Sequence, residues 1–564
     1  MMNRRGFLQA TGAVAPVPLV ATTARAQENN DVDASINESH EPRVFVREDF
    51  HHLSVLTPPL TRADVTKTVD LLAGTGVNTL IFSLGSRGGM CLYDTRVGQM
   101  HSDNVDKWNH AVHYRDALHI RQLVAEGWDR PKLFCDRCHE IGMLFLAGAP
   151  LNIGAYTTEV VRGTGRTSDF VFNNPQFRVG QEEDPRAKHV SATRMNFMFP
   201  EVRDERLRIY EELLARYETD GVEVQSEVLP ICKYSEAARC APLLTDWLRK
   251  LRKVAKTAEQ AQGRHKRIYV RIPAHPGVWK TVGFDVARWI SEQLVDGLIC
   301  ASNESEVLDQ DLDLSEVVAL ARGSACRVLV DCGTTLQKRV ENKATPAMIW
   351  AAAANAYHQG AVGFGLNEMV RSQELSLLGD MCQTFRLLGS PELLATADKV
   401  YHVRDLPKKP QSFVSGLPGT TPPLPRVLEE GRTRKFPLRV ADDLHHWHKL
   451  GRVKAVKLRV RISNIEPSMN EIRIFLNGRP LAETSLEITD LTYRFINEGV
   501  AYQGSQIYEY TLPPDDFPTC GKNYVDITLT RRDPAVDLEF QVADIDCTVE
   551  YRAHRNFERH PIEY

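Results

Sequence analysis

Residues 217–230, with the sequence YETDGVEVQSEVLP, decide the fold that the chain indicates. Their centre, 221–225, is a short strand-forming run, and successive side chains along a strand point to opposite faces. The two valines therefore lie on one face, whereas Glu223 and Gln225 lie on the other. Acidic side chains are rarely buried without a partner. A strand with one apolar and one acidic face therefore predicts the inside of a barrel mouth.

Glu227 follows close behind this strand. We expect Glu223 and Glu227 to lie beside a solvated pocket at the carboxyl end of the strand, with Gln225 lining it. An alternative is that Glu223 has a structural role and forms an ion pair with an arginine of a neighbouring strand. Arg271 stands in such a strand, so it is either that partner or a substrate-binding residue.

Short apolar runs alternate with helical patterns between residues 50 and 390, which is typical of βα units around a parallel sheet. The expected strands are 53–57, 78–84, 144–149, 221–225, 268–272, 297–301, 328–331 and 361–366. Expected helices include 62–73, 204–217, 243–261, 347–358 and 374–388. Eight such units predict an α/β fold, a (β/α)8 TIM barrel with insertions.

The chain has 564 residues, which is too long for one compact domain. Residues 406–425 are rich in proline, glycine, serine and threonine, as linkers are. Alternating or β-branched runs follow at 456–462, 471–476, 508–512, 524–530 and 542–551, and Asn477-Gly478 is a hairpin signal. We expect a barrel domain at 43–400, a linker at 401–434 and an all-β sandwich domain at 435–564.

The amino terminus carries a targeting signal. Residues 3–8, NRRGFL, contain a twin-arginine motif, a weakly apolar run covers 10–21, and Ala24-Arg25-Ala26 fits a cleavage site. The apolar run is too short and too weak to span a membrane. We therefore expect a signal peptide at 1–26, a loose polar segment at 27–42, and export to the periplasm or out of the cell.

A formal net charge of −4 gives no indication of nucleic-acid binding. Cys135, Cys138 and His139 form a C-x-x-C-H pattern, which attaches c-type haem in other proteins. Residues 132–141 instead favour a helix that leads through Gly142 into an apolar strand, and the eleven cysteines form no recognisable disulfide framework. We expect no cofactor. The alternative metal ligands are His51-His52, or His445, His446 and His448. Adjacent histidines on a strand point to opposite faces, and we expect no metal.

Two long connections follow the second and third expected strands, and such loops build the binding sites of TIM barrels. Their polar side chains could hydrogen-bond a polyhydroxylated ligand, with Trp108 or Tyr93 as a flat apolar surface. The substrate-binding candidates on these loops are Arg87, His101, Trp108, Asn152, Arg194 and Asn196. Asp94, Arg96 and Asn109 lie on the same loops.

The carboxyl ends of later strands carry further acids and amides. The catalytic candidates are Glu223, Glu227, Glu304, Asp331 and Glu368, and Asn303 and Asn367 stand beside two of them as substrate-binding candidates. Paired carboxylates suit glycoside cleavage, because one donates a proton to the leaving oxygen while the other remains ionised. Each acid alone could equally be a surface or ion-paired residue.

The segments 197–203 (FMFPEVR) and 217–224, together with Val295-Asp296-Gly297 and 363–367 (GFGLN), resemble bacterial glycoside hydrolase-like TIM barrels of a family 10-like type. The resemblance implies a carbohydrate substrate and places Glu223 at the family's strand-four glutamate. Gln225 stands where that family has an aspartate. Pro150-Leu151-Asn152-Ile153 replaces an Arg-Met-Asn-Asp cluster after the third strand.

The resulting expectation is an exported glycoside hydrolase that acts on a polysaccharide or oligosaccharide. Gln225 and the altered third loop favour an alternative, a non-catalytic carbohydrate-binding barrel. A third alternative is a scaffolding protein that uses the sandwich to bind partners. Stereochemistry, linkage and oligomeric state do not follow from the sequence.

Overall fold

The computed structural model describes residues 41–49, 59–155, 163–189, 192–226, 230–302, 307–336, 343–367, 378–404, 423–491 and 505–553. Residues 42–564 form one compact unit, to which all the elements below belong. Two architectures follow one another along this unit, a closed parallel barrel and a pair of antiparallel sheets.

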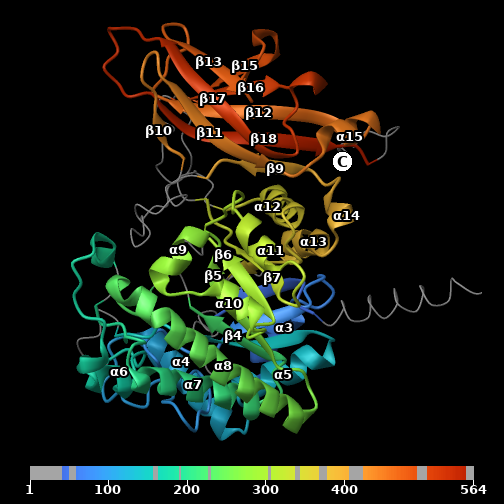
Figure 1. Ribbon diagram of the computed structural model, residues 1–564. Helices are drawn as coiled ribbons and strands as arrows, with labels where there is room; N and C mark the ends of the chain where they lie inside the picture. The colour runs from blue at the N-terminus through green and yellow to red at the C-terminus, as the bar shows by residue number, and fades with distance from the viewer. Residues whose placement is uncertain are drawn as a thin grey trace, which may run out of the picture. The chain divides into compact units, whose positions relative to one another are not determined.

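Eight parallel strands close into a barrel, so the predicted TIM barrel is confirmed (Figure 1). The strands are β1 Val44–Glu48, β2 Thr79–Ser83, β3 Leu144–Pro150, β4 Gly221–Gln225, β5 Arg267–Pro273, β6 Gly297–Ala301, β7 Arg327–Cys332 and β8 Gly363–Asn367. Each pairs with the next in parallel, and β1 closes the ring by pairing with β8. Seven of the eight lie where the sequence predicted them.

The first strand was predicted in the wrong place. The expected strand at 53–57 lies outside the described residues, and the strand that closes the barrel is Val44–Glu48. Its sequence, VFVRE, has only three apolar residues before Arg47 and Glu48, so it is easily taken for part of a polar leader. Both charged residues are nevertheless buried, because they end a strand that is flanked on both sides.

Helices surround the barrel and connect its strands. They are α3 Arg62–Asp70, α4 Ala111–Ala125, α5 Arg130–Glu140, α6 Asp169–Asn173, α7 Pro200–Ala215, α8 Ala237–Gln262, α9 Pro276–Val282, α10 Val286–Ser291, α11 Ser315–Ala321, α12 Pro346–His358, α13 Leu378–Leu388 and α14 Pro391–Leu394. The outward face of each strand packs on them. Val222 and Val224 of β4 belong to this outer core, together with Leu213 of α7 and Leu248 of α8.

Inside the barrel six apolar side chains from six strands form a separate cluster. They are Phe45, Ile81, Leu146, Tyr269, Ile299 and Leu329. Glycines on neighbouring strands make room for the two largest rings: a Cβ at Gly365 would lie 2.2 Å from the Phe45 ring, and a Cβ at Gly297 would lie 2.3 Å from the Tyr269 ring. The barrel is therefore a packed core at this level and not a pore.

At the amino-terminal end of the barrel, three residues that precede even-numbered strands cap the strand before them. Asn78 accepts from the Arg43 and Val44 amides, Asp220 accepts from the Phe145 amide, and Asp296 accepts from Ile268. Each side chain satisfies a backbone donor at the start of a buried strand, where an unpaired amide would be costly. These three side chains therefore stabilise the amino-terminal end of the barrel.

The C-x-x-C-H segment lies on α5, so the predicted structural helix is confirmed. Cys135 and Cys138 are buried in the core between α5 and the barrel. His139 reaches Asp220 at 2.9 Å instead of facing a ligand. All eleven cysteines are unbridged.

The carboxyl-terminal part forms two antiparallel sheets, as predicted. One has the order β10-β18-β12-β16-β15, with β9 also paired to β18, and the other has the order β11-β17-β13-β14. The strands are β9 Lys399–His402, β10 Arg426–Val427, β11 Thr433–Val440, β12 Val453–Ser463, β13 Glu471–Leu476, β14 Arg479–Pro480, β15 Leu486–Asp490, β16 Ser505–Thr511, β17 Gly521–Arg531 and β18 Gln541–Tyr551; the helix α15 spans Leu444–Lys449. Alternate residues such as Leu458, Val460, Ile527 and Leu529 fill the space between the sheets.

Asn477-Gly478 forms the predicted tight turn between β13 and β14, with a positive φ at both residues (53° and 79°). Strand β9 ends the barrel segment yet belongs to a sheet of the sandwich. The amide group of Gln310 donates to the backbone oxygens of Met348 in α12 and of Val400 in β9, which joins the two parts. Within the described ranges no helix combines the length and the hydropathy of a membrane span.

Candidate functional site at the barrel mouth

A polar layer lies directly above the apolar cluster, toward the carboxyl ends of the strands. On four strands the next inward-facing position is polar, so Arg47 follows Phe45 and Asp331 follows Leu329. We call the following seven buried residues the interior polar cluster: Arg47, Ser83, Glu223, Gln225, Arg271, Asp331 and Asn367. This end of a TIM barrel is where active sites lie.

Glu223 occupies the centre of the cluster and has no exposed surface. Its Oε2 accepts from Gln225 Nε2 at 2.8 Å and lies 3.3 Å from Arg47 Nε. Its Oε1 lies 3.7 Å from Arg271 Nε. The predicted shared face of Glu223 and Gln225 is therefore confirmed, and so is the alternative that Arg271 faces Glu223. The sequence did not indicate the pairing with Arg47.

Arg271 joins this group to the second interior carboxylate. Its guanidinium contacts the carboxylate of Asp331 on β7 as well as facing Glu223 on β4. Two acids from non-adjacent strands thus share one arginine at the centre of the barrel. This is the meeting of carboxylates that the sequence predicted for the strand ends.

The remaining members add further hydrogen bonds. Arg47 Nη1 donates to Asn367 Oδ1 at 2.9 Å, across the β1–β8 junction. Ser83 Oγ donates to Gln225 Oε1 at 3.1 Å, which fixes the orientation of the amide. Arg47 and Ser83 were missed by sequence reasoning. The signal for Ser83 was available, because it stands two residues after an inward-facing isoleucine at the end of a predicted strand.

The charges of the cluster are balanced, with two arginines and two carboxylates. Within the described residues, Glu223 faces the guanidinium groups of Arg47 and Arg271, and Asp331 faces that of Arg271. A carboxylate held against a guanidinium suits a nucleophilic or charge-stabilising role. A proton donor for a glycosidic oxygen would have to come from another residue.

Three predicted loop residues hold the connection that follows β4. Asn152 Nδ2 donates to the Ser226 backbone oxygen at 2.9 Å, and Asn196 Nδ2 donates to Glu236 Oε2 at 2.9 Å. Arg194 donates to the Pro230 backbone oxygen, and burial lowers the pKa of Arg194 to about 10. These side chains position the edge of the mouth and do not join the interior polar cluster.

His101 is fully buried outside the mouth, so its assignment to substrate binding is corrected. Its Nε2 lies 3.7 Å from the Asp116 carboxylate of α4, and burial lowers the pKa of His101 although that carboxylate opposes the shift. Trp108 packs against Tyr114 with the ring centroids 5.3 Å apart. Arg87 is exposed, and its backbone oxygen accepts from the Gly154 amide at 2.8 Å.

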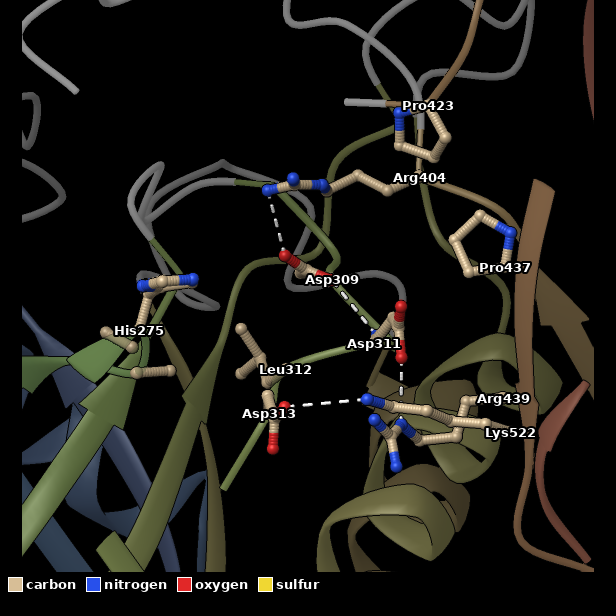
Figure 2. Close-up of a pocket in the computed structure, with 12 residues that line it drawn as sticks. His275, Asp309, Asp311, Leu312, Asp313, Arg404, Pro423, Pro437, Arg439 and Lys522 are labelled. Atoms are coloured by element: carbon tan, nitrogen blue, oxygen red, sulfur yellow. Dashed lines mark hydrogen bonds and ion pairs between the residues drawn. The ribbon is translucent and has the colours of Figure 1, made fainter. Parts of the chain in front are cut away.

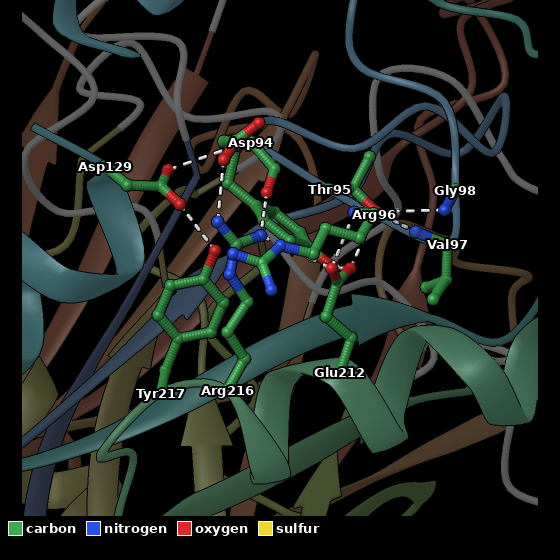
Figure 3. Close-up of polar contacts among 10 residues, drawn as sticks. Asp94, Thr95, Arg96, Val97, Gly98, Asp129, Glu212, Arg216 and Tyr217 are labelled. Atoms are coloured by element: carbon green, nitrogen blue, oxygen red, sulfur yellow. Dashed lines mark hydrogen bonds and ion pairs between the residues drawn. The ribbon is translucent and has the colours of Figure 1, made fainter. Parts of the chain in front are cut away.

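In the long connection after β2, the Arg96 amide contacts Glu212 of α7 and Asp94 contacts Arg216 at the end of that helix (Figure 3). Arg216 Nη2 donates to Asp94 Oδ2 at 2.6 Å, and the Asp94 amide donates to Asp129 at 3.2 Å. The Tyr217 hydroxyl donates to Asp129 Oδ2 at 2.5 Å. Burial, followed by the charge of Asp129, raises the pKa of Tyr217.

Glu212 of α7 fixes the rest of this loop (Figure 3). It accepts from the Arg96 amide at 2.6 Å, from the Thr95 hydroxyl at 2.6 Å and from the Tyr93 hydroxyl at 2.9 Å. Tyr93 is completely buried, so the expected flat apolar surface at that residue is wrong. The loop was expected to hydrogen-bond a ligand, but these polar groups hydrogen-bond a helix instead.

Four predicted site residues, Glu227, Asn303, Glu304 and Glu368, lie outside the described residues, as do His51 and His52. Their roles therefore stay predictions. Among the residues that the structure describes, no group of three or more His, Cys, Asp or Glu side chains is arranged to hold a metal ion.

Comparison with family models gives no match, and comparison with curated protein sequences gives none. Solved structures with a similar chain path include an α-L-fucosidase, isoenzyme 2, from Paenibacillus thiaminolyticus, at 12% identity and a TM-score of 0.39. That alignment covers 62% of this chain and 49% of the fucosidase, so the chain spans about half its length.

Two further structures are similar at the same level. The PgaB (BpsB) glycoside hydrolase domain from Bordetella bronchiseptica has 13% identity and a TM-score of 0.38, over 60% of this chain and 99% of that domain. A family 36 α-galactosidase from Geobacillus stearothermophilus has 10% identity and a TM-score of 0.36, over 91% of this chain and 56% of the enzyme. At these values the likenesses assign neither family nor activity, so the chemistry has to be argued from the residues themselves.

Proposed function

We propose that this chain is a glycoside hydrolase-like protein that binds carbohydrate at the barrel mouth and cleaves a glycosidic bond there. The observation that carries the proposal is the pair of interior carboxylates, Glu223 and Asp331, held on two sides of Arg271 at the carboxyl end of a closed barrel. Glycosidases need one carboxylate that stays ionised next to the reacting carbon.

In this proposal Glu223 or Asp331 supplies the ionised carboxylate, and Arg47 and Arg271 hold it in place. The proton donor is one of Glu227, Glu304 or Glu368, which the sequence places at the ends of strands on the same side. Asn367 and Gln225 offer amide groups for sugar hydroxyls, since each amide both donates and accepts hydrogen bonds.

Release of reducing ends from a panel of polysaccharides tests the proposal. Glu223→Gln and Asp331→Asn should each lower turnover by about 100-fold or more, as expected for a group that acts on the transition state. Asp220→Asn is the matched control, because Asp220 is also buried and ion-paired but precedes β4 at the opposite end of the barrel. Turnover is expressed per folded molecule, and thermal unfolding measures whether each variant is folded. Unchanged turnover in both folded mouth variants contradicts the catalytic assignment.

A second candidate is a carbohydrate-binding barrel without turnover. The contacts of Glu223 with Arg47, Arg271 and Gln225 favour it, because a buried glutamate with a purely structural role would make the same contacts. Binding of an oligosaccharide without release of reducing ends, by the wild-type protein, would support this candidate.

We also propose that the protein is exported through a twin-arginine pathway, supported by Arg4-Arg5 and the following apolar run. A family 10-like origin of the barrel is a separate part of the proposed function, and the 217–224 segment supports it. Replacement of both arginines by lysine should keep the protein in the cytoplasm of a bacterium that exports the wild type. Equal export of both forms contradicts the proposal.

A further inference from the structure

A cavity of about 280 Å³ lies where the loop after β6 meets the sandwich, and we call it the seam cavity (Figure 2). The sandwich side contributes Arg404 and Arg439 among others, and the barrel contributes Ala274, His275, Ala301, Asp309, Asp311, Leu312 and Asp313. Its volume is near the lower limit of small-molecule sites, which are about 300–1,000 Å³.

The seam cavity adjoins the barrel mouth. Ala301 is the last residue of β6 and lines the cavity, and it is the register partner of Asp331 on β7. Ala301 follows Ile299 by two positions, so it shares the inward face on which Asp331 lies. One wall of the cavity is therefore the rim of the interior polar cluster.

Three aspartates of the barrel meet three cations of the sandwich side in this cavity (Figure 2). They form the pairs Asp309–Arg404 at 3.1 Å, Asp311–Arg439 at 2.9 Å and Asp313–Lys522 at 3.5 Å. The lining is thus balanced in charge and rich in both donors and acceptors. A charged ligand would lie next to a side chain of its own charge as well as one of the opposite charge, and this repulsion costs binding free energy.

Two of the lining groups retain a donor. Arg439 is buried, its Nε is bound to Asp311, and its Nη2 makes no hydrogen bond within the described residues. His275 accepts from the Gly277 amide through Nδ1 at 3.1 Å, which leaves Nε2 as the N–H donor. Of these two donors, His275 Nε2 is the one that a ligand oxygen in the cavity can reach, because Arg439 Nη2 is enclosed by protein atoms. Leu312, Pro423 and Pro437 supply apolar surface beside these donors.

Hydroxyl groups both donate and accept, which matches a lining of paired carboxylates and cations. We propose that the seam cavity is an accessory subsite for a neutral, polyhydroxylated segment of the carbohydrate, built jointly by the barrel and the sandwich. The proposal rests on the proposed function at the barrel mouth. In this proposal the sandwich contributes to ligand binding and does not only cap the barrel.

Binding of neutral hexasaccharides tests the subsite, because they reach beyond the mouth whereas disaccharides do not. Cellohexaose, maltohexaose, xylohexaose and mannohexaose, their disaccharides and hexagalacturonate are titrated calorimetrically into the full chain. We expect at least one neutral hexasaccharide to bind more tightly than its disaccharide. His275→Ala and Lys522→Ala should each reduce that hexasaccharide's affinity by about 3- to 10-fold, the effect of one hydrogen bond, and leave the disaccharide unchanged.

Lys454→Ala is the matched control, because Lys454 forms a comparably exposed ion pair with Glu550 on the sandwich and does not line the cavity. It should bind every probe as the wild type does. If His275→Ala and Lys522→Ala bind the hexasaccharide as tightly as the wild type, the subsite is overturned while the proposed function stands. If hexagalacturonate binds more tightly than every neutral probe, the proposal that the ligand is neutral is overturned. Failure of the wild type to bind any probe overturns both proposals.

Discussion

Gln225 donates a hydrogen bond from Nε2 to Glu223 Oε2 at 2.8 Å, between inward-facing residues two positions apart on β4. The amide acts as a fixed donor, because its oxygen is held by Ser83. An aspartate at position 225 would instead place a second carboxylate beside Glu223, on a side chain one methylene shorter than that of glutamine. The glutamine therefore keeps Glu223 in a site with balanced charge.

Gln225→Asp should make stability strongly dependent on pH. Two carboxylates this close cannot both ionise, so the folded variant binds a proton that the unfolded chain releases above about pH 4. Stability should then fall as pH rises from 5 to 8, by about 1–3 kcal/mol relative to the wild type. Urea unfolding at several pH values measures this. Gln225→Asn, which adds no charge, should lack the pH dependence, and equal slopes for both variants would contradict the prediction.

Arg47→Met should destabilise the fold by about 3–5 kcal/mol, because it leaves Glu223 buried beside one guanidinium where there were two. Removing the charge of Glu223 as well should relieve part of that cost. The double variant Arg47→Met, Glu223→Gln should therefore be less destabilised than the sum of the two single variants. Additive free energies of unfolding would show that Arg47 and Glu223 do not interact.

The three ion pairs at the seam should contribute unequally to stability. Arg439 is only 7% exposed in its side chain, whereas Lys522 is 53% exposed. Asp311→Asn leaves a buried guanidinium without its carboxylate and should cost about 1–3 kcal/mol. Lys522→Ala removes a solvent-screened pair and should change stability by less than about 0.5 kcal/mol. Chemical denaturation distinguishes them, and equal costs would contradict the dependence on burial.

His113 should make the protein sensitive to acid. Burial, then the positive charges of Arg166, His110 and His101, lower the pKa of His113 from 6.5 to about 3, and Asp116 opposes the shift. The unfolded chain therefore binds a proton on this ring between about pH 6.5 and 3 that the folded chain does not bind, so stability falls as pH falls through this window. His113→Gln should lose less stability than the wild type between pH 7 and 4.5 in urea unfolding.

His265 provides a control of opposite sign. Its interactions with the carboxylates of Asp296 and Glu259 raise its pKa above 6.5, so its contribution is present at low pH and is lost as pH rises through the raised value. His265→Gln should therefore lose more stability at pH 4.5 than at pH 8. Identical pH profiles for the two histidine variants would contradict both assignments.

Short apolar runs between helical patterns were sufficient to predict seven strands, and alternation along β4 predicted the shared face of Glu223 and Gln225. The first of these signals failed at β1, because the apolar run before Arg47 is only three residues long. The arginine that pairs with Glu223 was missed for the same reason. Strand order and register bring these two residues together across 176 positions of sequence, and no local pattern carries that information.

The loop residues show a different limit. His101 and Asp94 were expected at the mouth because long loops after barrel strands usually build the binding site, yet the loop packs against α4 and the end of α7. Arg194 and Asn196 were expected to touch substrate, yet they hold backbone and side-chain groups after β4. Residue type indicated a hydrogen-bonding role correctly, but the partner depends on how the chain folds back.

The interior glycines have a consequence for how this barrel can change. A Cβ at Gly148 would lie 2.3 Å from Gln225 Nε2, just as Gly365 leaves space for Phe45. The space inside the barrel is thus shared between adjacent strands. A residue on one strand can be enlarged only if the residue that faces it on the neighbouring strand becomes smaller. Related chains with a larger residue at position 148 should carry a shorter one at 225. Reshaping the mouth by laboratory evolution will accordingly proceed through coupled exchanges and not through single replacements.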